Sequence, residues 1–302
     1  MGNYYLSRFK FFKFALKMEN SNKDTLPETQ GVDSKLDDKK YFESIDGAQY
    51  FSENKTAPKF IYAIKTSGIT EGDTALDIGC GRGDLMMALA QKGADVTGID
   101  YSQDALDIAQ QAIASQTAEW KHRLKVLHSN ATDLRFPDQT FDFIFMTDLV
   151  EHLYPAELQK CFAECKRVLK SDGKLIVHTA PNRWYNDFGY PLWEQPVNKI
   201  LNRLFRQNLL TRPIRNEIDL KVHINEQTLL SLKKYLVAAG FNSKIWLGSE
   251  YVIPVKKESS GMQILEISRQ ILCHAFPLSL LPPLKYIFCN DIWGISEKAK
   301  AQ

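Results

Sequence analysis

The chain has 302 residues, of which 44% are hydrophobic and 25% charged, so it is long enough to bury a full-sized core. Its 38 basic and 36 acidic residues leave a net charge of +2, which argues against a nucleic acid as the general partner. The five cysteines lack a zinc or disulfide spacing, and no apolar run is as long as a bilayer-spanning helix. These features favour a protein of the reducing cytoplasm.

The first part of the chain predicts an arm, a linker and short helices. Residues 1–17 interleave basic with aromatic residues, which suits either a helix on an anionic membrane surface or an arm packed on a partner. The rest of the segment 1–40 is polar and predicts a linker. Aromatic residues recur through 41–67, so we expect residues 41–74 to form an N-terminal helical cap.

From residue 74 onward, short apolar strands alternate with helices. Ser102 has the chemistry of a helix N-cap, and Gly93 and Gly173 mark expected helix ends. Strands are predicted at 74–79, 95–100, 125–130, 141–148 and 174–180, with helices at 84–93, 102–117 and 155–173. This alternation of apolar strands and helices predicts an α/β fold with a doubly wound, mostly parallel sheet covered on both faces.

The pattern breaks after residue 182. Residues 183–222 are rich in basic and aromatic residues without a clear strand, and they predict an inserted helical cap over the substrate. The C-terminal part of the core is assigned to 223–302, with an apolar, proline-containing insertion at 258–285. A helix is expected there at 225–241, and strands at 243–251 and 287–296.

Three glycines at alternate positions, Gly79, Gly81 and Gly83, follow the first strand. Glycines this dense at a strand end indicate that the backbone passes close to a ligand. A phosphate-binding P-loop is excluded, because no Lys-Ser/Thr pair follows the last glycine. A dinucleotide fingerprint is disfavoured, because Asp84 replaces its third glycine and would repel a pyrophosphate.

The pattern D-x-G-x-G-x-G at 77–83 resembles the first motif of the class I S-adenosylmethionine-dependent methyltransferases. Asp100 at the end of the second strand and the segment 129–145 resemble further motifs of that family, in the expected order. The resemblance covers residues 75–182, with a weaker match at 223–250, and is greatest to small-molecule enzymes of the ubiquinone-pathway type. It implies a Rossmann-like core with a seven-stranded sheet.

The resemblance also implies how the cofactor is held. The glycine loop would bind the methionine end of S-adenosylmethionine, and Asp100 would accept hydrogen bonds from the ribose hydroxyls. Asn130, where the family usually has Asp, would face the adenine amino group, with the Ala131 N–H on a ring nitrogen. The full implied set is Asp77, Gly79, Cys80, Gly81, Gly83, Asp100, Tyr101, Asn130, Ala131 and Thr147.

A D-x-x-E-H pattern follows the fourth strand, at Asp148, Glu151 and His152. These residues would share one face of a helical turn, and their oxygen and imidazole groups suit Mg²⁺, Mn²⁺ or Zn²⁺. The spacing resembles the E-x-x-E-H site of two metal-assisted O-methyltransferase groups, the ubiquinone-pathway catechol enzymes and the small-RNA 2′-hydroxyl enzymes. In the second group a later histidine completes the site, and His223 occupies a comparable place. The open alternative is a metal-free site in which Glu151 caps the helix end. In both cases His152 is the candidate catalytic residue, whereas His178 is expected to be a buried, satisfied histidine.

The resulting functional prediction is transfer of a methyl group to an oxygen of a small or lipid-linked acceptor. Carbon or nitrogen acceptors remain alternatives, as does a protein that binds the cofactor without transfer. Peripheral membrane contact through 1–17 and 258–285 is a further expectation, either for the enzyme or for a membrane-peripheral protein with the same fold.

Overall fold

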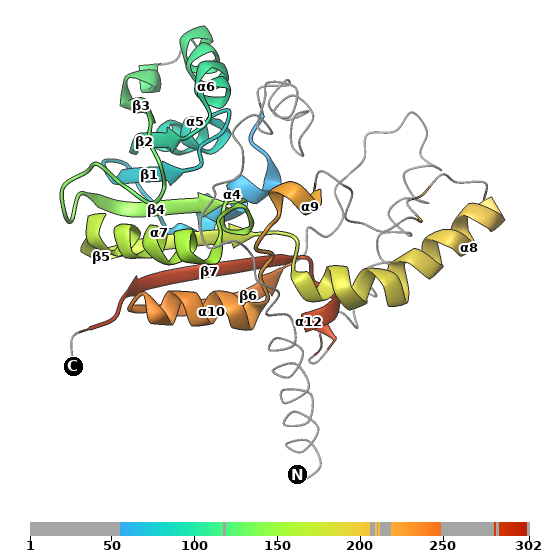
Figure 1. Cartoon of the computed structure of the whole chain (residues 1–302). Helices are drawn as coiled ribbons and strands as arrows, with labels where there is room; N and C mark the ends of the chain where they lie inside the picture. The colour runs from blue at the N-terminus through green and yellow to red at the C-terminus, as the bar shows by residue number, and fades with distance from the viewer. Residues whose placement is uncertain are drawn as a thin grey trace. The chain divides into compact units, whose positions relative to one another are not determined.

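The computed structural model describes residues 55–116, 119–205, 209, 211, 219–248, 281 and 284–300 (Figure 1). The expectations for residues 1–40, and for most of 258–285, lie outside these described residues. Contacts divide the chain into a larger and a smaller unit. The larger unit comprises Gln30–Arg183, Arg215–Glu250 and Asn290–Gln302, and the smaller one Met1–Thr29, Trp184–Ile214 and Tyr251–Cys289. No helix in the described part of the chain combines the length and apolarity needed to cross a bilayer.

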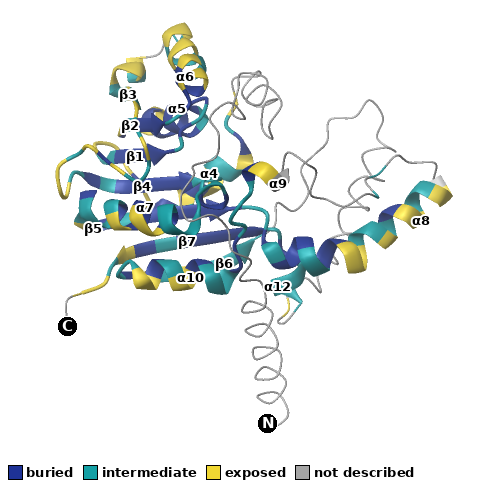
Figure 2. Ribbon diagram, viewed as in Figure 1, coloured by how far each residue is buried: buried dark blue, intermediate teal, exposed yellow. Residues whose placement is uncertain are grey.

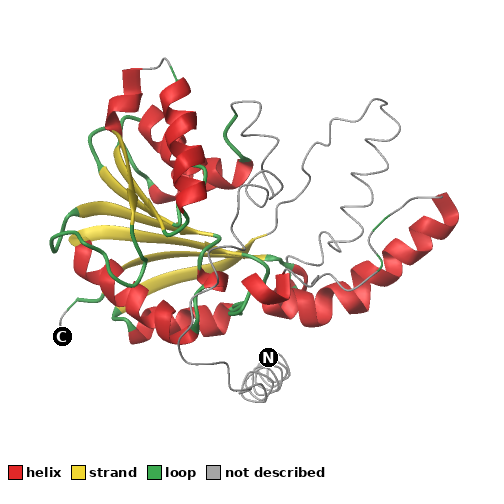
Figure 3. Cartoon of the chain, turned by 45° about the horizontal axis from the view of Figure 1, so that its top comes forward, coloured by secondary structure: helices red, strands yellow, loops and turns green. Residues whose placement is uncertain are grey.

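A seven-stranded sheet in the order β3-β2-β1-β4-β5-β7-β6 lies at the centre of the larger unit (Figure 3). Its strands are β1 Thr74–Ile78, β2 Asp95–Asp100, β3 Leu124–His128, β4 Phe141–Thr147, β5 Leu169–Thr179, β6 Phe241–Gly248 and β7 Asp291–Lys298. The first five strands pair in parallel, and β7 runs antiparallel to both β5 and β6. The predicted Rossmann-like, mostly parallel sheet is therefore confirmed.

Helices connect and cover these strands. In the larger unit they are α4 Pro58–Ser67, α5 Asp84–Gln91, α6 Gln103–Ser115, α7 Pro155–Val168, α9 Asp219–Val222 and α10 Leu229–Ala238, with 3₁₀ turns at Glu119–Arg123 (η2) and Val150–His152 (η3). The predicted cap of α6 is present, because the Ser102 hydroxyl oxygen accepts a hydrogen bond from the Ala105 N–H at 3.3 Å.

The predicted end of α7 at Gly173 is wrong, because the helix stops at Val168 and β5 begins at Leu169. Leu169 is fully buried and pairs with Phe141 of β4, so sheet pairing determines this boundary. Gly173 instead permits a close approach inside the sheet. A Cβ atom at this position would lie 2.8 Å from the Asp142 carbonyl oxygen and 2.8 Å from Leu169 Cδ1.

Two buried clusters occupy the two faces of the sheet. Leu76 and Ile144 belong to one cluster, whereas their chain neighbours Ala75 and Phe145 belong to the other. This division follows from the alternation of side chains along a strand. Burial of both faces explains why the strands read as continuous apolar runs.

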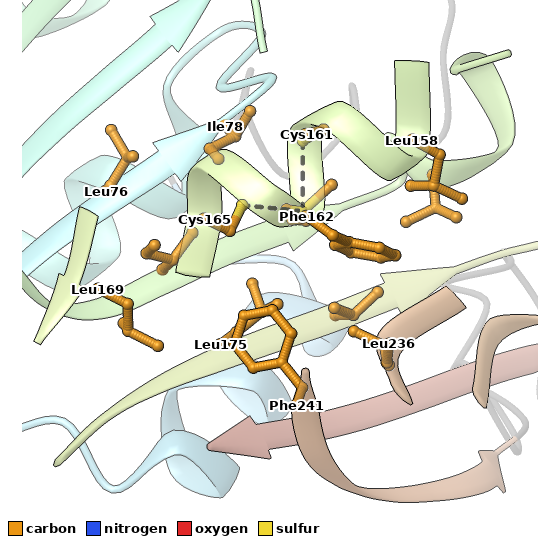
Figure 4. Close-up of a cluster of buried hydrophobic side chains, with 14 of the residues drawn as sticks. Leu76, Ile78, Leu158, Cys161, Phe162, Cys165, Leu169, Leu175, Leu236 and Phe241 are labelled. Atoms are coloured by element: carbon orange, nitrogen blue, oxygen red, sulfur yellow. Dashed lines mark hydrogen bonds between the residues drawn. The ribbon is translucent and has the colours of Figure 1, made fainter. Parts of the chain in front are cut away.

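Helix α7 contributes two thiols to the first cluster. The sulfurs of Cys161 and Cys165, one helical turn apart, lie 4.0 and 3.8 Å from the sulfur of Met146 on β4 (Figure 4). Both cysteines are fully buried, and burial raises the pKa of Cys165 well above its ordinary value. They act as small hydrophobic side chains of the core.

The described part of the smaller unit is helical. It contains a π-helical segment η4 Tyr185–Glu194 and the helices α8 Gln195–Phe205 and α12 Lys285–Phe288. Segments η4 and α12 pack closely at Gly189, where a Cβ atom would lie 2.2 Å from the Ile287 carbonyl oxygen. The expected apolar insertion therefore contributes at least its last residue to a helix that packs in this unit.

Candidate active site

The glycine loop between β1 and α5 has left-handed backbone at Gly79, Gly81 and Gly83, with φ of 74°, 51° and 82°. L-residues with side chains are strained in this region, so the alternating glycines are required by the conformation. The N–H groups of Gly79 and Cys80 donate to the Ile99 carbonyl at 2.8 and 3.0 Å. These bonds fasten the loop to the end of β2.

Asp100, the last residue of β2, ties this loop to the start of α6. Its two carboxylate oxygens accept hydrogen bonds from the N–H groups of Gly81 and Ser102, each at 2.9 Å. The side chain is buried, and burial raises the pKa of Asp100 although the N–H donors oppose that effect. Asp100 therefore shapes the loop, a role additional to the ribose contact that the sequence predicts.

Asp77 carries the least satisfied polar atom of the loop. Its side chain is 1% exposed, and its Oδ1 atom has no hydrogen-bond partner among the described residues. Burial, together with the nearby charges of Asp100 and Asp84, raises the pKa of Asp77 to about 8. A buried carboxyl oxygen without a donor is unfavourable unless a ligand supplies one. An ammonium group fits this position, because it brings both a donor and a compensating charge.

Asn130 and Ala131 lie two and three residues after β3, whose end lies beside the end of β2. The Ser129 N–H donates to the Asp100 carbonyl at 3.0 Å, which joins the two strand ends. The Asn130 side-chain oxygen accepts from the N–H and hydroxyl of Thr132 at 2.8 and 2.9 Å. This pair of bonds fixes the orientation of the Asn130 amide group.

The remaining predicted cofactor residues lie at the same edge of the sheet. Tyr101 follows β2, and its carbonyl oxygen lies 3.0 Å from His128 Nε2. Thr147 is the last residue of β4. The ten predicted cofactor residues therefore lie at or just after the carboxyl ends of β1 to β4, the edge at which open α/β sheets bind ligands.

Asp148, immediately after β4, is held by two cations. Its Oδ1 lies 2.7 Å from His178 Nδ1 of β5, and its Oδ2 lies 2.5 Å from Lys59 Nζ of α4. Its N–H also donates to the His178 carbonyl at 3.1 Å. These contacts hold a left-handed backbone, with φ of 55°, at a residue that is not glycine.

The charges around Asp148 compensate one another. Burial alone would lower the pKa of His178, but the carboxylates of Asp148 and Asp291 outweigh it and raise that pKa to about 10. Burial would likewise raise the pKa of Asp148, but Lys59 and His178 hold it well below its usual range. His178 is thus buried, as expected, and ion-paired, and its Nε2 lies 3.8 Å from Asp291 Oδ1. Its Nδ1 makes no hydrogen bond of regular geometry among the described residues.

Glu151, His152 and His223 form a separate group. One potential ligand atom from each residue lies within 4.8 Å of the others, and the two imidazole rings are 4.9 Å apart between centroids. The Asn225 N–H donates to the Glu151 carbonyl at 3.0 Å, which brings the segment carrying His223 to the η3 turn. The structure therefore unites three of the four predicted metal residues and places Asp148 in the ion-pair network.

Burial sets the protonation of this group. Burial, followed by the charge of Asp148, raises the pKa of Glu151 to about 8, and the Thr179 hydroxyl donates to Glu151 Oε2 at 2.7 Å. Burial, followed by His223, lowers the pKa of His152 to about 3. A neutral imidazole can bind a metal directly, whereas Glu151 would release its proton on binding one. The donor set of one carboxyl and two imidazoles fits Zn²⁺ or Mn²⁺ better than Mg²⁺.

Comparison with known proteins relates the chain that carries this site to a protein family. The profile of the methyltransferase domain matches residues 76–177. Residues 76–177 form a methyltransferase domain of the class I S-adenosylmethionine-dependent kind. The family prediction made from the glycine loop and Asp100 is confirmed, and the acidic loop fits a cofactor that carries an amine and a sulfonium.

The similar curated proteins are quinone methyltransferases. The chain is 30% identical over 174 residues to a demethylmenaquinone methyltransferase of Clavibacter sepedonicus, covering 57% of this chain and 66% of that protein. It is 32% identical over 148 residues to a 2-phytyl-1,4-naphtoquinone methyltransferase of Nostoc sp., covering 47% and 63%. It thus spans less than two thirds of the length of either relative.

Solved structures show the same fold at low sequence identity. A methyltransferase from Methanosarcina mazei aligns with a TM-score of 0.52 and 21% identity, covering 79% of this chain and 97% of that one. A phosphoethanolamine N-methyltransferase of Haemonchus contortus aligns with a TM-score of 0.53 and 18% identity, covering 81% and 52%. At these identities the likeness concerns the fold alone.

Three residues of the candidate site were missed from the sequence. Lys59 lies in the first turn of α4, far along the chain from its partner Asp148, and no local motif marks it. Asp291 opens β7 and reaches His178 through the antiparallel pairing of β5 and β7. Thr179 follows His178 and is the last residue of β5. Its position at the strand end was the one feature of the sequence that could have indicated a role in the site.

Proposed function

We propose that the protein transfers a methyl group from S-adenosylmethionine to an oxygen of a small or lipid-linked acceptor. The observation that carries the cofactor part is the buried Oδ1 of Asp77, which has no donor within the described part of the chain and lies beside a left-handed glycine loop. The names of the relatives support a quinone-like acceptor with a hydrocarbon tail. Such an acceptor combines a ring with ionisable oxygens and an apolar chain.

The bound cofactor supplies an electrophilic methyl group for an in-line displacement, so the protein mainly positions the reactants. Asp77 and the glycine loop hold the methionine end, and Asp100 keeps that loop in place. The His152 imidazole is neutral at physiological pH, because its pKa is about 3. It can accept a hydrogen bond from an acceptor hydroxyl, but it is a weak base, which favours an acceptor that ionises readily.

A divalent ion at Glu151, His152 and His223 is part of this proposal. An ion bound there would lower the pKa of an acceptor hydroxyl and orient its oxygen. The test is the metal content of the purified protein and of His152→Ala combined with His223→Ala, measured by mass spectrometry after dialysis against Zn²⁺ or Mn²⁺. Stoichiometric metal in the parent protein alone supports the ion. Equal content in both proteins supports the metal-free alternative, in which His152 only lines the pocket.

The acceptor atom and the membrane contact also belong to the proposal. Carbon or nitrogen is the alternative acceptor atom, and cofactor binding without transfer is the alternative outside enzymes. Contact of residues 1–17 and 258–285 with a membrane would bring a lipid-linked acceptor within reach. Most of those two segments lie outside the described residues.

The decisive experiment combines binding and transfer. Calorimetric titration with S-adenosylhomocysteine is expected to show saturable binding. Incubation with methyl-labelled S-adenosylmethionine and reduced demethylmenaquinone should label the quinol, and mass spectrometry of the product identifies the methylated atom. Absence of S-adenosylhomocysteine binding would overturn the proposal. Binding without label in any quinol would exclude this acceptor class, and a label on carbon would exclude O-methylation.

A further inference from the structure

Exposed apolar side chains are concentrated in the smaller unit. Eight large hydrophobic residues are exposed in the described part of the chain, and five of them belong to this unit, although it contributes far fewer described residues. The five are Leu192, Trp193, Ile200, Leu204 and Leu281. Four of these lie on η4 and α8, at the spacing of one helix face. Exposed stretches recur along α8 in Figure 2.

Polar side chains of α8 form hydrogen bonds with the backbone at residues 209 and 211 of the same unit. Gln195 Nε2 donates to the Thr211 carbonyl at 2.8 Å. Asn202 exchanges two hydrogen bonds with the backbone of Leu209, at 3.0 and 2.8 Å, and Asn198 is 1% exposed. Because its amide side chains are used internally, the helix presents Ile200 and Leu204 outward, at 57% and 67% exposure. This is the reverse of the usual arrangement of a surface helix.

The charges on the outward side have one sign. From Trp184 to Leu204 the exposed charged residues are Lys199 and Arg203, which alternate with Ile200 and Leu204. We call the set Leu192, Trp193, Lys199, Ile200, Arg203 and Leu204 the α8 face. Apolar side chains, a tryptophan and basic residues on one helix face are the combination that binds the interface of an anionic bilayer.

We propose that the α8 face docks on an anionic lipid bilayer. The inference rests on the proposed function in one respect, because an acceptor with a hydrocarbon tail resides in the bilayer. The apolar side chains would enter the headgroup region, while Lys199 and Arg203 would contact lipid phosphates. The charge of the face selects this partner over an uncharged apolar surface.

The test measures partitioning of the full chain onto vesicles by co-sedimentation. Vesicles of phosphatidylglycerol mixed with phosphatidylcholine are compared with phosphatidylcholine alone, at low and high salt. We expect binding to the anionic vesicles, weakened by salt. Ile200→Glu should reduce the partition coefficient by about tenfold. Lys199→Gln with Arg203→Gln should reduce it by about fivefold per charge on anionic vesicles.

Val237→Glu is the matched control, because Val237 is also 57% exposed on a helix but belongs to the larger unit. Equal losses in Ile200→Glu and Val237→Glu, or full binding by Ile200→Glu, would overturn the proposal, as would the absence of vesicle binding. A dimer in light scattering that Ile200→Glu dissociates would assign the face to a second copy instead. Titration with S-adenosylhomocysteine separates the two proposals. Vesicle binding without cofactor binding refutes only the proposed function, and the converse result refutes only the docking face.

Discussion

The two halves of the active-site edge handle buried charge in opposite ways. At the ends of β1 and β2, Arg82 pairs with Asp84 at 3.2 Å. Asp100 accepts hydrogen bonds from backbone N–H groups, and Asp77 Oδ1 has no donor among the described residues. At the ends of β4 and β5, Asp148 has two cations within 2.7 Å. The carboxylates of the first half are thus suited to a cationic ligand, whereas Asp148 in the second half uses its charge to fix the turn after β4. The predictions below test this division.

The largest expected effect is on cofactor binding. Asp100→Ala removes the acceptor of the Gly81 N–H in the glycine loop and of the Ser102 N–H at the start of α6. We expect S-adenosylhomocysteine affinity to fall by about 100-fold, since hydrogen bonds to a charged group contribute about 1.5–3 kcal/mol each. The measurement is calorimetric titration. Asp104→Ala, which removes an exposed carboxylate in the first turn of α6, is the control, and a similar loss in both variants would contradict this role of Asp100.

An intermediate effect is expected on the free energy of unfolding when the ion pairs of Asp148, after β4, are changed. Lys59→Met leaves Asp148 with one cation, and both side chains keep some exposure, at 16% and 32%. The free energy of unfolding should therefore fall by about 1–3 kcal/mol, less than for a fully buried pair. Urea denaturation measures it. Adding Asp148→Asn should recover part of the loss, because it removes the stranded charge.

The control for that effect is Lys65→Met, an exposed lysine on the same helix. If Lys59→Met costs no more than Lys65→Met, the ion pair does not stabilise the turn after β4, and another contact must hold the left-handed Asp148.

The smallest effect concerns the carboxyl group of Asp77. The folded-state pKa of Asp77 is raised from 3.8 to about 8, so the folded protein binds more protons than the unfolded chain between these values. Stability of the ligand-free protein should therefore fall as pH rises through this window. Asp77→Asn should flatten that dependence and raise the free energy of unfolding near pH 8, while cofactor affinity decreases.

Urea denaturation of both proteins at about pH 5 and about pH 8 makes the comparison. Glu151 and His178 titrate in both, so the difference between the two curves isolates Asp77. Identical pH dependence would show that the Asp77 carboxyl is already satisfied in the ligand-free protein.

Local patterns in the sequence were sufficient for the parallel core. Apolar runs ending in glycine or aspartate located β1, β2 and β4, because buried strands must be apolar and ligand-contacting residues follow their carboxyl ends. The three glycines of the loop, Gly79, Gly81 and Gly83, were informative for a similar reason, since left-handed backbone restricts the choice of residue. The grouping of His223 with His152 followed from the family resemblance, and the structure places them together.

Tertiary contacts determined what local patterns did not reveal. Asp148 shares a helical spacing with Glu151, yet its left-handed backbone and its pairing with Lys59 turn it away from that group. The end of α7 was predicted too late because Leu169 gains more from pairing in the sheet than Gly173 does from capping a helix. Such partners lie far apart in sequence, and no capping or periodicity rule connects them.

The position of β7 between β5 and β6 has a consequence for the order of assembly. Within the described part of the chain, β6 is an edge strand that pairs with β7 alone, and β7 follows it in sequence. As the polypeptide emerges from the ribosome, β6 therefore waits for residues 291–298 to provide this pairing. The same step delivers Asp291 to His178. Completion of the sheet and neutralisation of the buried charge cluster are therefore a single event during biosynthesis.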